Sequence, residues 1–374
     1  MDANLSGSTV LVTGGAGFIG SFLTEELVEL GADVRVADNF SRGTPSKLDN
    51  VREDIEVLPV DLTTQKGCIE ATEGVDHVFH LAASVGGIHY IKQANVGGLA
   101  PSVLMNQCML EAARITGVDR FLFASSACIY RQQHDGLNRF SEDQAIPANP
   151  HSTYGWAKIL GEVACDAYHT DTSLTTSSVR IFNCYGPRES LDPDSSHVIP
   201  SLCRKVIEAD PGESIELFGD GSQQRGFIYV TDLVDGMIEV LRTKTDGEPI
   251  NLGNSKEVVS IEELAATIID ISGKDLSLTY DRSKPTGTDK YACDMTTMRA
   301  ELDWEPSVSL EDGLERVYEW AERELDADRP VVSADGGDDE RLGRRAGAGH
   351  RRCVVHWKPS RRRPRRGRGE RSRR

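Results

Sequence analysis

Short apolar runs alternate with helical patterns of apolar residues through the first half of the chain. The expected strands are Thr9–Val12, Asp33–Ala37, Ile55–Pro59, His77–Leu81, Arg120–Ala124 and Thr175–Ile181. The expected helices include Phe18–Leu30, Val96–Thr116 and Tyr154–Tyr168. Because strands that alternate with helices form parallel sheets covered on both faces, this pattern predicts a doubly wound α/β fold.

The pattern loosens after Gly186-Pro187, where the connections become long and the strands short, as at Ile215–Phe218. A helical pattern at Val230–Leu241 is expected to return to the main sheet. Two further helical patterns, Ile261–Ser272 and Leu310–Leu325, close the globular part. The second half therefore predicts a smaller, discontinuous C-terminal lobe.

A glycine-rich turn follows the first strand, and the stretch Val10–Gly20 reads VLVTGGAGFIG. Gly14 permits a tight turn, Gly17 lets a pyrophosphate approach the backbone, and Gly20 allows the helix to pack on the strand. The phosphates would bind N–H groups at the N-terminus of the following helix. This turn predicts a Rossmann-type fold that binds a dinucleotide.

The second strand ends in Asp38, about 20 residues further on, where a carboxylate can hold the ribose hydroxyls of adenosine. An acid there disfavours a 2′-phosphate, so NAD is favoured over NADP, although Arg42 leaves NADP as the alternative. Ligands of such sheets bind at the carboxyl ends of the strands. The residues expected to bind the cofactor are Gly14, Gly17, Phe18, Ile19, Gly20, Asp38, Asp61, Leu62, Leu81, Ala82, Ala83, Tyr154 and Lys158.

These patterns divide the chain into an expected set of parts. Residues 1–183 would form the NAD-binding Rossmann domain, with 227–253 returning to it. Residues 184–226 and 254–326 would form the substrate-binding lobe, and 327–374 a disordered linker and Arg-rich tail.

Charge is distributed unevenly along the 374 residues, whose formal net charge is −17. The stretch from Arg341 to the C-terminus holds fifteen Lys or Arg and one acid, so the first 340 residues carry a net charge of −31. An acidic body disfavours non-specific nucleic-acid binding, and the basic tail lacks apolar periodicity. We expect the tail to be a disordered extension without a role in activity, with a nucleic-acid-binding arm as the alternative.

The eight cysteines include no CxxC pair, and several lie in apolar patterns, as in a reducing cytosol. The N-terminus has neither the basic nor the apolar region of a signal peptide, and no later segment is long enough to span a membrane. These features predict a soluble cytoplasmic protein.

Tyr154 and Lys158 lie four residues apart and therefore share one face of an expected helix. Exposed pairs of this kind are common, but this pair follows a stretch that can start a helix and comes after a serine-rich strand end. The lysine ammonium and the positive charge of a nicotinamide would both lower the pKa of the phenol toward neutrality. The phenolate could then take a proton from a substrate hydroxyl while the carbinol hydride passes to NAD.

Ser125 and Ser126 end the fifth expected strand. A hydroxyl here could bond the same substrate oxygen and orient Tyr154, although strand capping remains the plainer role for Ser125. Cys128 lies two residues beyond Ser126 and would point to the same side of an extended segment. A buried, inert cysteine is the usual case, but the position at the active edge of the sheet favours a catalytic one.

The GGAGFIG, SSACIY and YGWAK motifs resemble those of the extended short-chain dehydrogenase/reductase family of NAD-dependent nucleotide-sugar epimerases and dehydratases, from about Thr9 to Trp320. Within this family the chain is most similar to the GDP-mannose 3,5-epimerases. That subgroup carries SSACIYP where this chain has SSACIYR, a Gly-Gly as in AASVGGIHYI, and EAAR before a basic-Phe strand. Dehydratases and decarboxylases more often have Glu or Asp at the Cys128 position, which makes this cysteine the discriminating residue.

The resemblance implies that Tyr154 and Lys158 oxidise the sugar at C4, with Ser126 assisting. The resulting 4-keto group acidifies the C3 and C5 hydrogens, and Cys128 would remove or return one such proton before the ketone is reduced. The residues implied to bind the nucleotide sugar are Gly86, Gly87, Ser126, Asn183, Gln223 and Arg225, with Arg225 at the diphosphate.

Three features depart from the family pattern, one of which is Arg131, where the family usually has Pro or Gly. The subgroup has a lysine as partner of the cysteine where this chain has Val198, and we expect the neighbouring His197 to act as the second acid. The late arginine that often holds the diphosphate is not evident in this chain, and Lys290 or Arg282 would replace it.

Two rival functions stay open beside the epimerase. One is a 4-epimerase, or a 4,6-dehydratase or decarboxylase of an activated hexose, for which Cys128 need not be essential. The other is a non-catalytic regulatory protein that senses NAD, which the intact Tyr154–Lys158 pair disfavours. No metal is expected, and the helices Val96–Thr116 and Tyr154–Tyr168 resemble those through which relatives dimerise, so a homodimer is expected.

Overall fold

A seven-stranded parallel sheet forms the centre of the computed structural model, which describes residues 3–84, 95–131, 137–150, 152–284 and 290–327. The strand order is β12-β7-β5-β4-β1-β2-β3, and every neighbouring pair is parallel. The strands are β1 (Thr9–Thr13), β2 (Asp33–Ala37), β3 (Glu56–Leu58), β4 (His77–His80), β5 (Arg120–Ser126), β7 (Thr175–Ile181) and β12 (Pro249–Leu252). The six strands expected here and the Rossmann-type α/β fold are confirmed.

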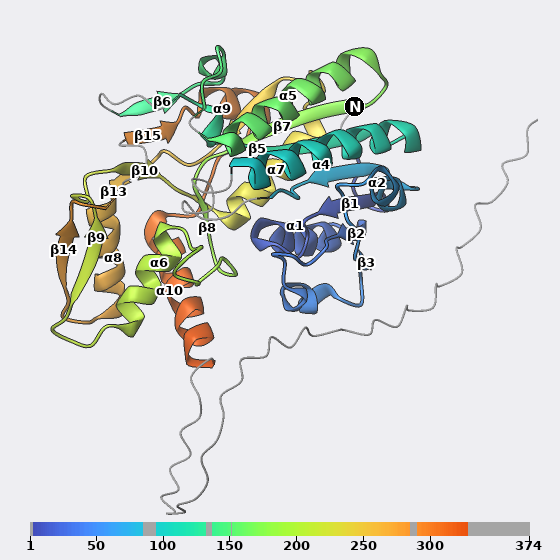
Figure 1. The fold of residues 1–374 in the computed structure, drawn as a ribbon. Coiled ribbons are helices and arrows are strands. Elements are labelled where there is room, and N and C mark those ends of the chain that lie inside the picture. Colours follow the sequence, from blue (N-terminus) through green and yellow to red (C-terminus); the bar gives the residue numbers. More distant parts are fainter. Residues whose placement is uncertain (1–2, 85–94, 132–136, 151, 285–289, 328–374) are drawn as a thin grey trace, which may run out of the picture. The chain divides into compact units, whose positions relative to one another are not determined.

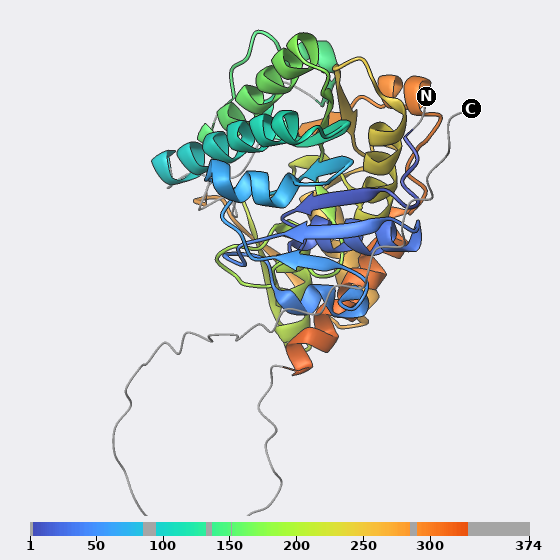
Figure 2. The ribbon, with the colours of Figure 1, turned by 90° about the vertical axis from the view of Figure 1, so that its right-hand side faces the viewer.

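Alternate side chains of these strands face opposite sides of the sheet and fill two separate cores. The helices on one side are α1 (Phe18–Glu29) and α7 (Val230–Thr243), and those on the other are α2 (Gln65–Thr72), α4 (Asn95–Thr116) and α5 (Thr153–Asp171). Val10 and Val12 of β1 pack on the α1 and α7 side, whereas Leu11 packs on the α2, α4 and α5 side. Figure 2 shows helices on both sides of the blue strands. The sheet thereby presents the carboxyl ends of β1, β2, β4 and β5 at one edge.

Three smaller sheets lie outside the main one (Figure 1). The four-stranded sheet has the order β13-β10-β15-β6 and consists of β6 (Asn138–Phe140), β10 (Gln224–Gly226), β13 (Val258–Ser260) and β15 (Lys290–Cys293). The two-stranded sheets pair β8 (Cys184–Tyr185) with β11 (Ile228–Tyr229) and β9 (Ser214–Phe218) with β14 (Ser277–Asp281). The four-stranded sheet draws β6 from the first 183 residues and its other strands from later in the chain.

A separate apolar core holds the later helices together. These helices are α6 (Val198–Glu208), α8 (Ile261–Ser272) and α10 (Leu310–Ala327), with α9 (Thr296–Leu302) packing beside α7 and β12. Leu202 of α6, Ile268 of α8 and Val317 of α10 are fully or almost fully buried in this core. Short 3-10 helices occur at η1 (Pro45–Val51), η2 (Ala127–Ile129) and η3 (Glu142–Ala145).

Some of the expected features lie outside the described residues. These are Gly86, Gly87 and the tail from residue 328 onward. Among the helices that are described, none is both long enough and apolar enough to cross a bilayer.

Candidate active site

The glycine loop between β1 and α1 is a bare backbone turn. Gly14 has a φ of +69°, which L side chains rarely adopt, and its N–H donates to the Ala37 carbonyl at 2.8 Å. A Cβ atom at Gly20 would lie 2.2 Å from the Gly14 carbonyl oxygen, and one at Gly17 would lie 3.0 Å from the same atom. Side chains here would push α1 away from the strand. The N-terminus of α1, which Gly17 caps, is therefore open to a pyrophosphate, as NAD requires.

Asp38 ends β2 directly against this loop. Its carboxylate accepts hydrogen bonds from the Ala16 N–H at 3.1 Å and the Phe40 N–H at 2.8 Å. Burial raises the pKa of Asp38, while these two hydrogen bonds and the nearby Lys47 act in the opposite direction. The carboxylate is thus fixed beside the loop, where an adenosine ribose would lie.

The residues after β4 are tied to the end of β1. The Thr13 hydroxyl accepts the N–H groups of Leu81 and Ala82, both at 3.1 Å. Because that oxygen already accepts twice, we assign its proton to the bond with His80 Nδ1 at 2.8 Å. Leu81, Ala82 and Ala83 are half-buried and lie next to the glycine loop, since a Cβ at Gly14 would approach the Ala82 backbone to 3.1 Å.

Through His80, this series of hydrogen bonds continues to α5. With Nδ1 accepting, Nε2–H donates to the Asn106 side-chain oxygen at 3.1 Å, and the Asn106 amide donates to the Ala157 carbonyl at 3.5 Å. Burial and, to a smaller extent, the charge on Lys158 lower the pKa of His80 to about 3, so the ring is neutral. A continuous network therefore joins the glycine loop to the helix that carries Tyr154. Neither His80 nor Asn106 was expected as a site residue.

Lys158 lies in the second turn of α5 and is almost fully buried. Its Nζ donates to the Ala124 carbonyl at 2.6 Å and lies 5.5 Å from the centre of the Tyr154 ring. Burial lowers the pKa of Lys158 to about 8, against the opposing effects of Cys128 and Glu162. The ammonium is held at a fixed place beside the phenol.

The expected lowering of the Tyr154 pKa is wrong for the protein alone. Burial raises the pKa of Tyr154, and the nearby Cys128 raises it further, while a hydrogen bond with Ser126 lowers it. The physical reason is that removing the phenol from water disfavours its charged form more than the protein's own groups favour it. The resting side chain is the neutral phenol.

Ser126 and Cys128 meet in the short helix η2 rather than in an extended segment. The Ser126 hydroxyl accepts the Cys128 N–H at 3.2 Å. A Cβ at Gly155 would lie 2.5 Å from the Cys128 carbonyl oxygen, so only glycine lets α5 approach η2 this closely. Solvent reaches part of Cys128, but the protein packed around its thiol raises the pKa of that thiol. Ser126 and Lys158 have the opposite effect. The turn, not strand alternation, brings the thiol to Tyr154.

Ser125 has a structural partner instead. Its hydroxyl donates to the Glu162 carboxylate, which also forms a 2.9 Å ion pair with the almost fully buried Arg180. The plainer role expected for Ser125, a structural one at the strand end, agrees with this contact.

The opposite side of the site comes from the smaller sheets. The Asn183 amide donates to the Gly226 carbonyl at 2.9 Å, and its oxygen accepts the Tyr291 hydroxyl at 2.6 Å. The Arg225 guanidinium lies 4.4 Å from the centre of the Tyr291 ring. Burial raises the pKa of Tyr291, with Arg225 opposing and Cys128 adding to the rise, so the tyrosine also lies near the thiol. Tyr291 was not expected in the site.

Comparison with known proteins decides the family. The model described as "NAD dependent epimerase/dehydratase family" matches residues 10–253, a span that runs from β1 through α5 to β12. The chain belongs to the NAD dependent epimerase/dehydratase family. It is therefore an enzyme whose cofactor is NAD, as the sequence predicted.

Individual members of the family are similar over most of the chain. GDP-mannose 3,5-epimerase 1 of Oryza sativa subsp. japonica is 33% identical over 326 residues, which cover 86% of this chain and 83% of that protein. UDP-N-acetyl-alpha-D-glucosaminuronate decarboxylase of Bacillus cytotoxicus is 32% identical over 328 residues, covering 85% and 98%. The solved structure of UDP-glucuronic acid 4-epimerase from Bacillus cereus, in complex with UDP-glucuronic acid and NAD, matches with a TM-score of 0.74 and 30% identity, covering 84% and 99%.

Four further residues were expected to contact NAD, and the structure places them in different surroundings. Phe18 and Ile19 open α1 and pack against apolar cores. Asp61 follows β3, is exposed and accepts hydrogen bonds from the backbone and hydroxyl of Thr63, which lower its pKa. Leu62 is buried in the core on the α2 side of the sheet.

His197 occupies the N-cap position of α6, without a capping hydrogen bond from its side chain. Its Nδ1 hydrogen-bonds the buried carboxylate of Glu189, which raises the pKa of the imidazole. Among the described residues, no hydrogen bond joins His197 to Cys128 or Tyr154.

The remaining expected contacts lie in or near the smaller sheets. Gln223 is buried beside β10, and its carbonyl accepts the Ile261 N–H at 2.9 Å. Lys290 precedes Tyr291 in β15, opposite Gln224, and Arg282 follows β14 near Asp220. Of these two basic residues, Lys290 is therefore the nearer to Tyr291 along the chain.

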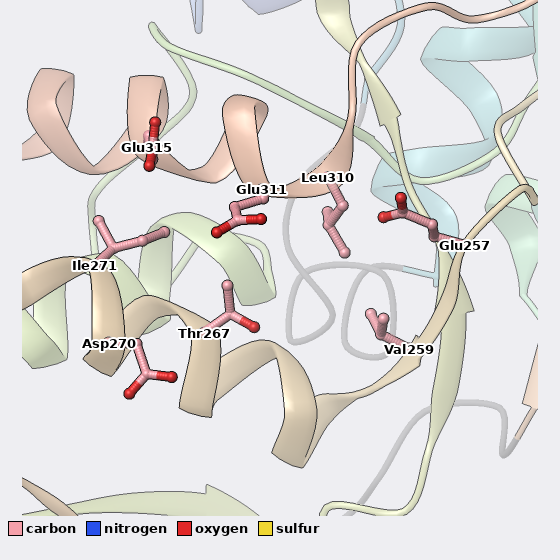
Figure 3. Close-up of a pocket in the computed structure, with 8 residues that line it drawn as sticks. All are labelled: Glu257, Val259, Thr267, Asp270, Ile271, Leu310, Glu311 and Glu315. Atoms are coloured by element: carbon pink, nitrogen blue, oxygen red, sulfur yellow. The ribbon is translucent and has the colours of Figure 1, made fainter.

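A separate hollow of about 580 Å³ lies between β13, α8 and α10 (Figure 3). Its lining residues are Glu257, Val259, Thr267, Asp270, Ile271, Leu310, Glu311 and Glu315. Four of these eight carry a negative charge, which would repel a diphosphate. In the described parts of the chain no group of His, Cys, Asp or Glu could hold a metal ion. This hollow is therefore unsuited to a nucleotide sugar.

Proposed function

We propose that this enzyme is a nucleotide-sugar epimerase that acts through a transient 4-keto-hexose, similar to the GDP-mannose 3,5-epimerases. The observation that carries the proposal is the position of Cys128. Solvent reaches this residue, and it interacts electrostatically with both Tyr154 and Lys158. Oxidation of the alcohol requires only Tyr154 and Lys158. A thiol beside them is explained if the enzyme also removes or returns a proton on carbon.

The glycine loop and Asp38 would hold NAD through its pyrophosphate and adenosine ribose. NAD, when bound, supplies the oxidant for the C4 carbinol and the reductant for the ketone. The other residues proposed to line the cofactor are Phe18, Ile19, Asp61, Leu62, Leu81, Ala82, Ala83, Tyr154 and Lys158.

Tyr154 is the proposed acid and base at the C4 oxygen. It takes the hydroxyl proton when the alcohol is oxidised and returns it when the ketone is reduced. Lys158 is fixed on the Ala124 carbonyl, 5.5 Å from the centre of the Tyr154 ring, where its charge would stabilise the phenolate between these steps. The Ser126 hydroxyl orients the phenol. The raised pKa of the resting phenol suits the return step, in which Tyr154 must hold a proton to donate.

Cys128 is the proposed base for a carbon acid. A 4-keto group acidifies the hydrogens on C3 and C5, because the carbanion is delocalised into an enolate. The Cys128 thiolate removes one such proton, and the charge on Lys158 favours that thiolate. We assign the second acid to His197, whose partner Glu189 keeps the imidazole protonated to higher pH.

The other side of the site would bind the rest of the substrate. Arg225 carries the charge expected to contact the diphosphate, with Asn183 and Gln223 as its neighbours, and Gly86 and Gly87 would let the hexose approach the backbone. The nucleotide and the hexose are proposed on similarity to the GDP-mannose 3,5-epimerase alone.

One observation favours a rival within the family. Burial raises the pKa of the Cys128 thiol, and a thiol that stays protonated at neutral pH is a poor base. A 4-epimerase or a decarboxylase would not need that base, and the curated relatives include a decarboxylase of similar identity. The non-catalytic sensor has no comparable support, since it would not need the buried Lys158 beside Tyr154.

We further propose a homodimer. The helices α4 and α5 pack together, and Trp156, Leu160 and Val163 form an exposed apolar stripe along α5 at helical spacing. Leu104 and Ile115 are exposed on α4. A second copy of this face would cover the stripe. A cytoplasmic location is proposed because the described cysteines are all free.

Solvent deuterium separates the 3,5-epimerase from a simple 4-epimerase, and the mass of the product separates it from a dehydratase or a decarboxylase, which lose water or carbon dioxide. The enzyme, loaded with NAD, is incubated in deuterium oxide with GDP-mannose and with a panel of other nucleotide hexoses, and incorporation is measured by mass. The proposal predicts deuterium at C3 or C5, and its loss in Cys128→Ala. Cys108→Ala, at a half-buried cysteine on α4, is the matched control and should incorporate normally. Turnover with unlabelled C3 and C5 would establish the 4-epimerase instead.

A further inference from the structure

Tyr291 contacts two residues of the proposed substrate side at once. It lies in β15, and the parallel pairing of β10 with β15 places it opposite Arg225. Its ring centre is 4.4 Å from the Arg225 guanidinium, and its hydroxyl donates to the Asn183 oxygen at 2.6 Å. One side chain therefore joins two residues that come from different elements.

Asn183 is held in one orientation by this contact. Its backbone φ of +31° is uncommon for a residue other than glycine, and its Nδ2 donates to the Gly226 carbonyl. Because that nitrogen faces a carbonyl, the side-chain oxygen must be the acceptor toward Tyr291. Loss of the Tyr291 hydroxyl would free one end of the amide and leave the other bonded.

Arg225 is constrained by stacking. Its guanidinium lies on the Tyr291 ring, and its Nη1 donates to the Gln224 carbonyl at 2.7 Å. The ring is in turn packed between Phe140 and Phe182, whose centres are 6.4 and 6.3 Å away. A long side chain fixed before the ligand arrives loses less conformational entropy on binding, so a fixed arginine binds a phosphate more tightly.

We propose that Tyr291 is a positioning residue for the nucleotide diphosphate. Its ring holds the Arg225 guanidinium, and its hydroxyl interacts with both Arg225 and the Asn183 amide. The inference rests on the proposed function, because it assumes that Arg225 and Asn183 face a nucleotide sugar. It adds a residue to that site which neither the glycine loop nor the catalytic helix could indicate.

Two substitutions separate the ring from the hydroxyl. Tyr291→Phe keeps the stacking on Arg225 and removes the hydroxyl's bonds to Asn183 and Arg225, whereas Tyr291→Leu removes the stacking as well. Tyr280→Phe is the matched control, since Tyr280 in β14 also donates its hydroxyl, to Glu262 at 2.8 Å, on an exposed surface. The probes are GDP and UDP, titrated by calorimetry into the NAD-loaded protein, followed by KM and kcat with a converted nucleotide sugar.

We expect Tyr291→Phe to weaken binding of the preferred diphosphate about threefold to tenfold, which is the range of one net hydrogen bond. Tyr291→Leu should weaken it further by a similar factor, for the lost cation–π contact. KM should rise in parallel, kcat should change less, and NAD affinity should match that of Tyr280→Phe.

Three results would overturn the proposal. The first is unchanged diphosphate affinity in Tyr291→Leu. The second is an equal loss of NAD affinity and thermal stability, which would mean a structural role. The third is failure of the unaltered protein to bind either GDP or UDP. Diphosphate binding requires no turnover, so a positive result stands even if no sugar is epimerised. Failure of the proposed function can therefore be distinguished from failure of the proposal for Tyr291.

Discussion

The two sides of the active site are built in different ways. On the sheet side, the proposed residues Ser126, Cys128, Tyr154 and Lys158 come from β5, η2 and α5, which all lie between residues 120 and 171 and are joined by hydrogen bonds that involve the backbone. On the opposite side, Asn183, Arg225 and Tyr291 come from distant segments and meet mainly through side chains. The proposed chemistry thus lies on elements joined through backbone contacts, and the proposed recognition residues are held by long-range side-chain contacts.

This difference offers a physical reason why one fold can serve many substrates. A change on the sheet side would disturb the alcohol oxidation itself. A change on the opposite side would alter which nucleotide sugar binds while the oxidation machinery is kept. The two sides should therefore respond to substitution in different measurements.

The largest effect is expected from Tyr154→Phe on the sheet side. Removing a general acid and base typically costs about 10²- to 10⁴-fold in kcat. NAD affinity, measured by calorimetry, should stay within about threefold, because the glycine loop is untouched. Tyr168→Phe, on the same helix, removes a hydroxyl that donates to Glu111 and should keep full activity. A Tyr154→Phe enzyme with normal kcat would contradict the assignment.

His197→Asn tests whether chemistry extends beyond the sheet side. If His197 is the second acid, its replacement should lower the rate of C3 or C5 exchange about 10²-fold. Glu189→Gln removes the carboxylate that raises the pKa of His197, so the alkaline limb of the pH profile should move to lower pH. Unchanged turnover in His197→Asn would leave the chemistry entirely on the sheet side.

Gly20→Ala probes how closely the sheet side is packed. The added Cβ would lie 2.2 Å from the Gly14 carbonyl oxygen, so α1 must shift. We expect a loss of about 1–3 kcal/mol in the free energy of unfolding, measured with urea, together with weaker NAD binding. Gly74→Ala provides a contrast, since Gly74 has a φ of +73° and no atom within 4 Å of its Cβ position, so it measures backbone strain without a clash, whereas Gly20 has no positive φ. A Gly20→Ala protein as stable as the unaltered one would refute the close-packing argument.

The smallest effect concerns the buried His80. Its pKa is about 3 in the folded protein against 6.5 when unfolded, so the unfolded state binds more protons between these values. Stability contributed by the neutral ring is therefore lost as the pH falls below 6.5. Between pH 7 and 5.5, the free energy of unfolding measured with urea should fall by about 1 kcal/mol more in the unaltered protein than in His80→Asn. Parallel pH curves would mean that His80 is not held neutral.

The sheet side could be predicted from the sequence because its signals are local. Gly14, Gly17 and Gly20 mark a turn by spacing alone, and Tyr154 and Lys158 share a helix face by spacing alone. The end points of the strands differed from expectation by one or two residues, since fraying and turns are set by tertiary contacts.

The rest of the site could not be predicted because it depends on long-range pairing. Tyr291 belongs to the site only because β15 pairs with β10, which no local pattern in KYAC indicates. The assumption of an extended Ser126–Cys128 segment was wrong, since the chain turns into η2. The sign of the Tyr154 pKa shift depends on burial, which spacing along a helix does not reveal.

The fate of a label at C4 tests the central claim most directly. Nucleotide hexoses carrying deuterium at C4, with GDP-mannose first, are converted by the NAD-loaded enzyme in ordinary water, and the product is examined by mass and NMR. Oxidation and reduction at a single carbon within one site predict that the deuterium is still at C4 in the product. Product in which the C4 deuterium has been replaced by solvent hydrogen would contradict the proposed mechanism.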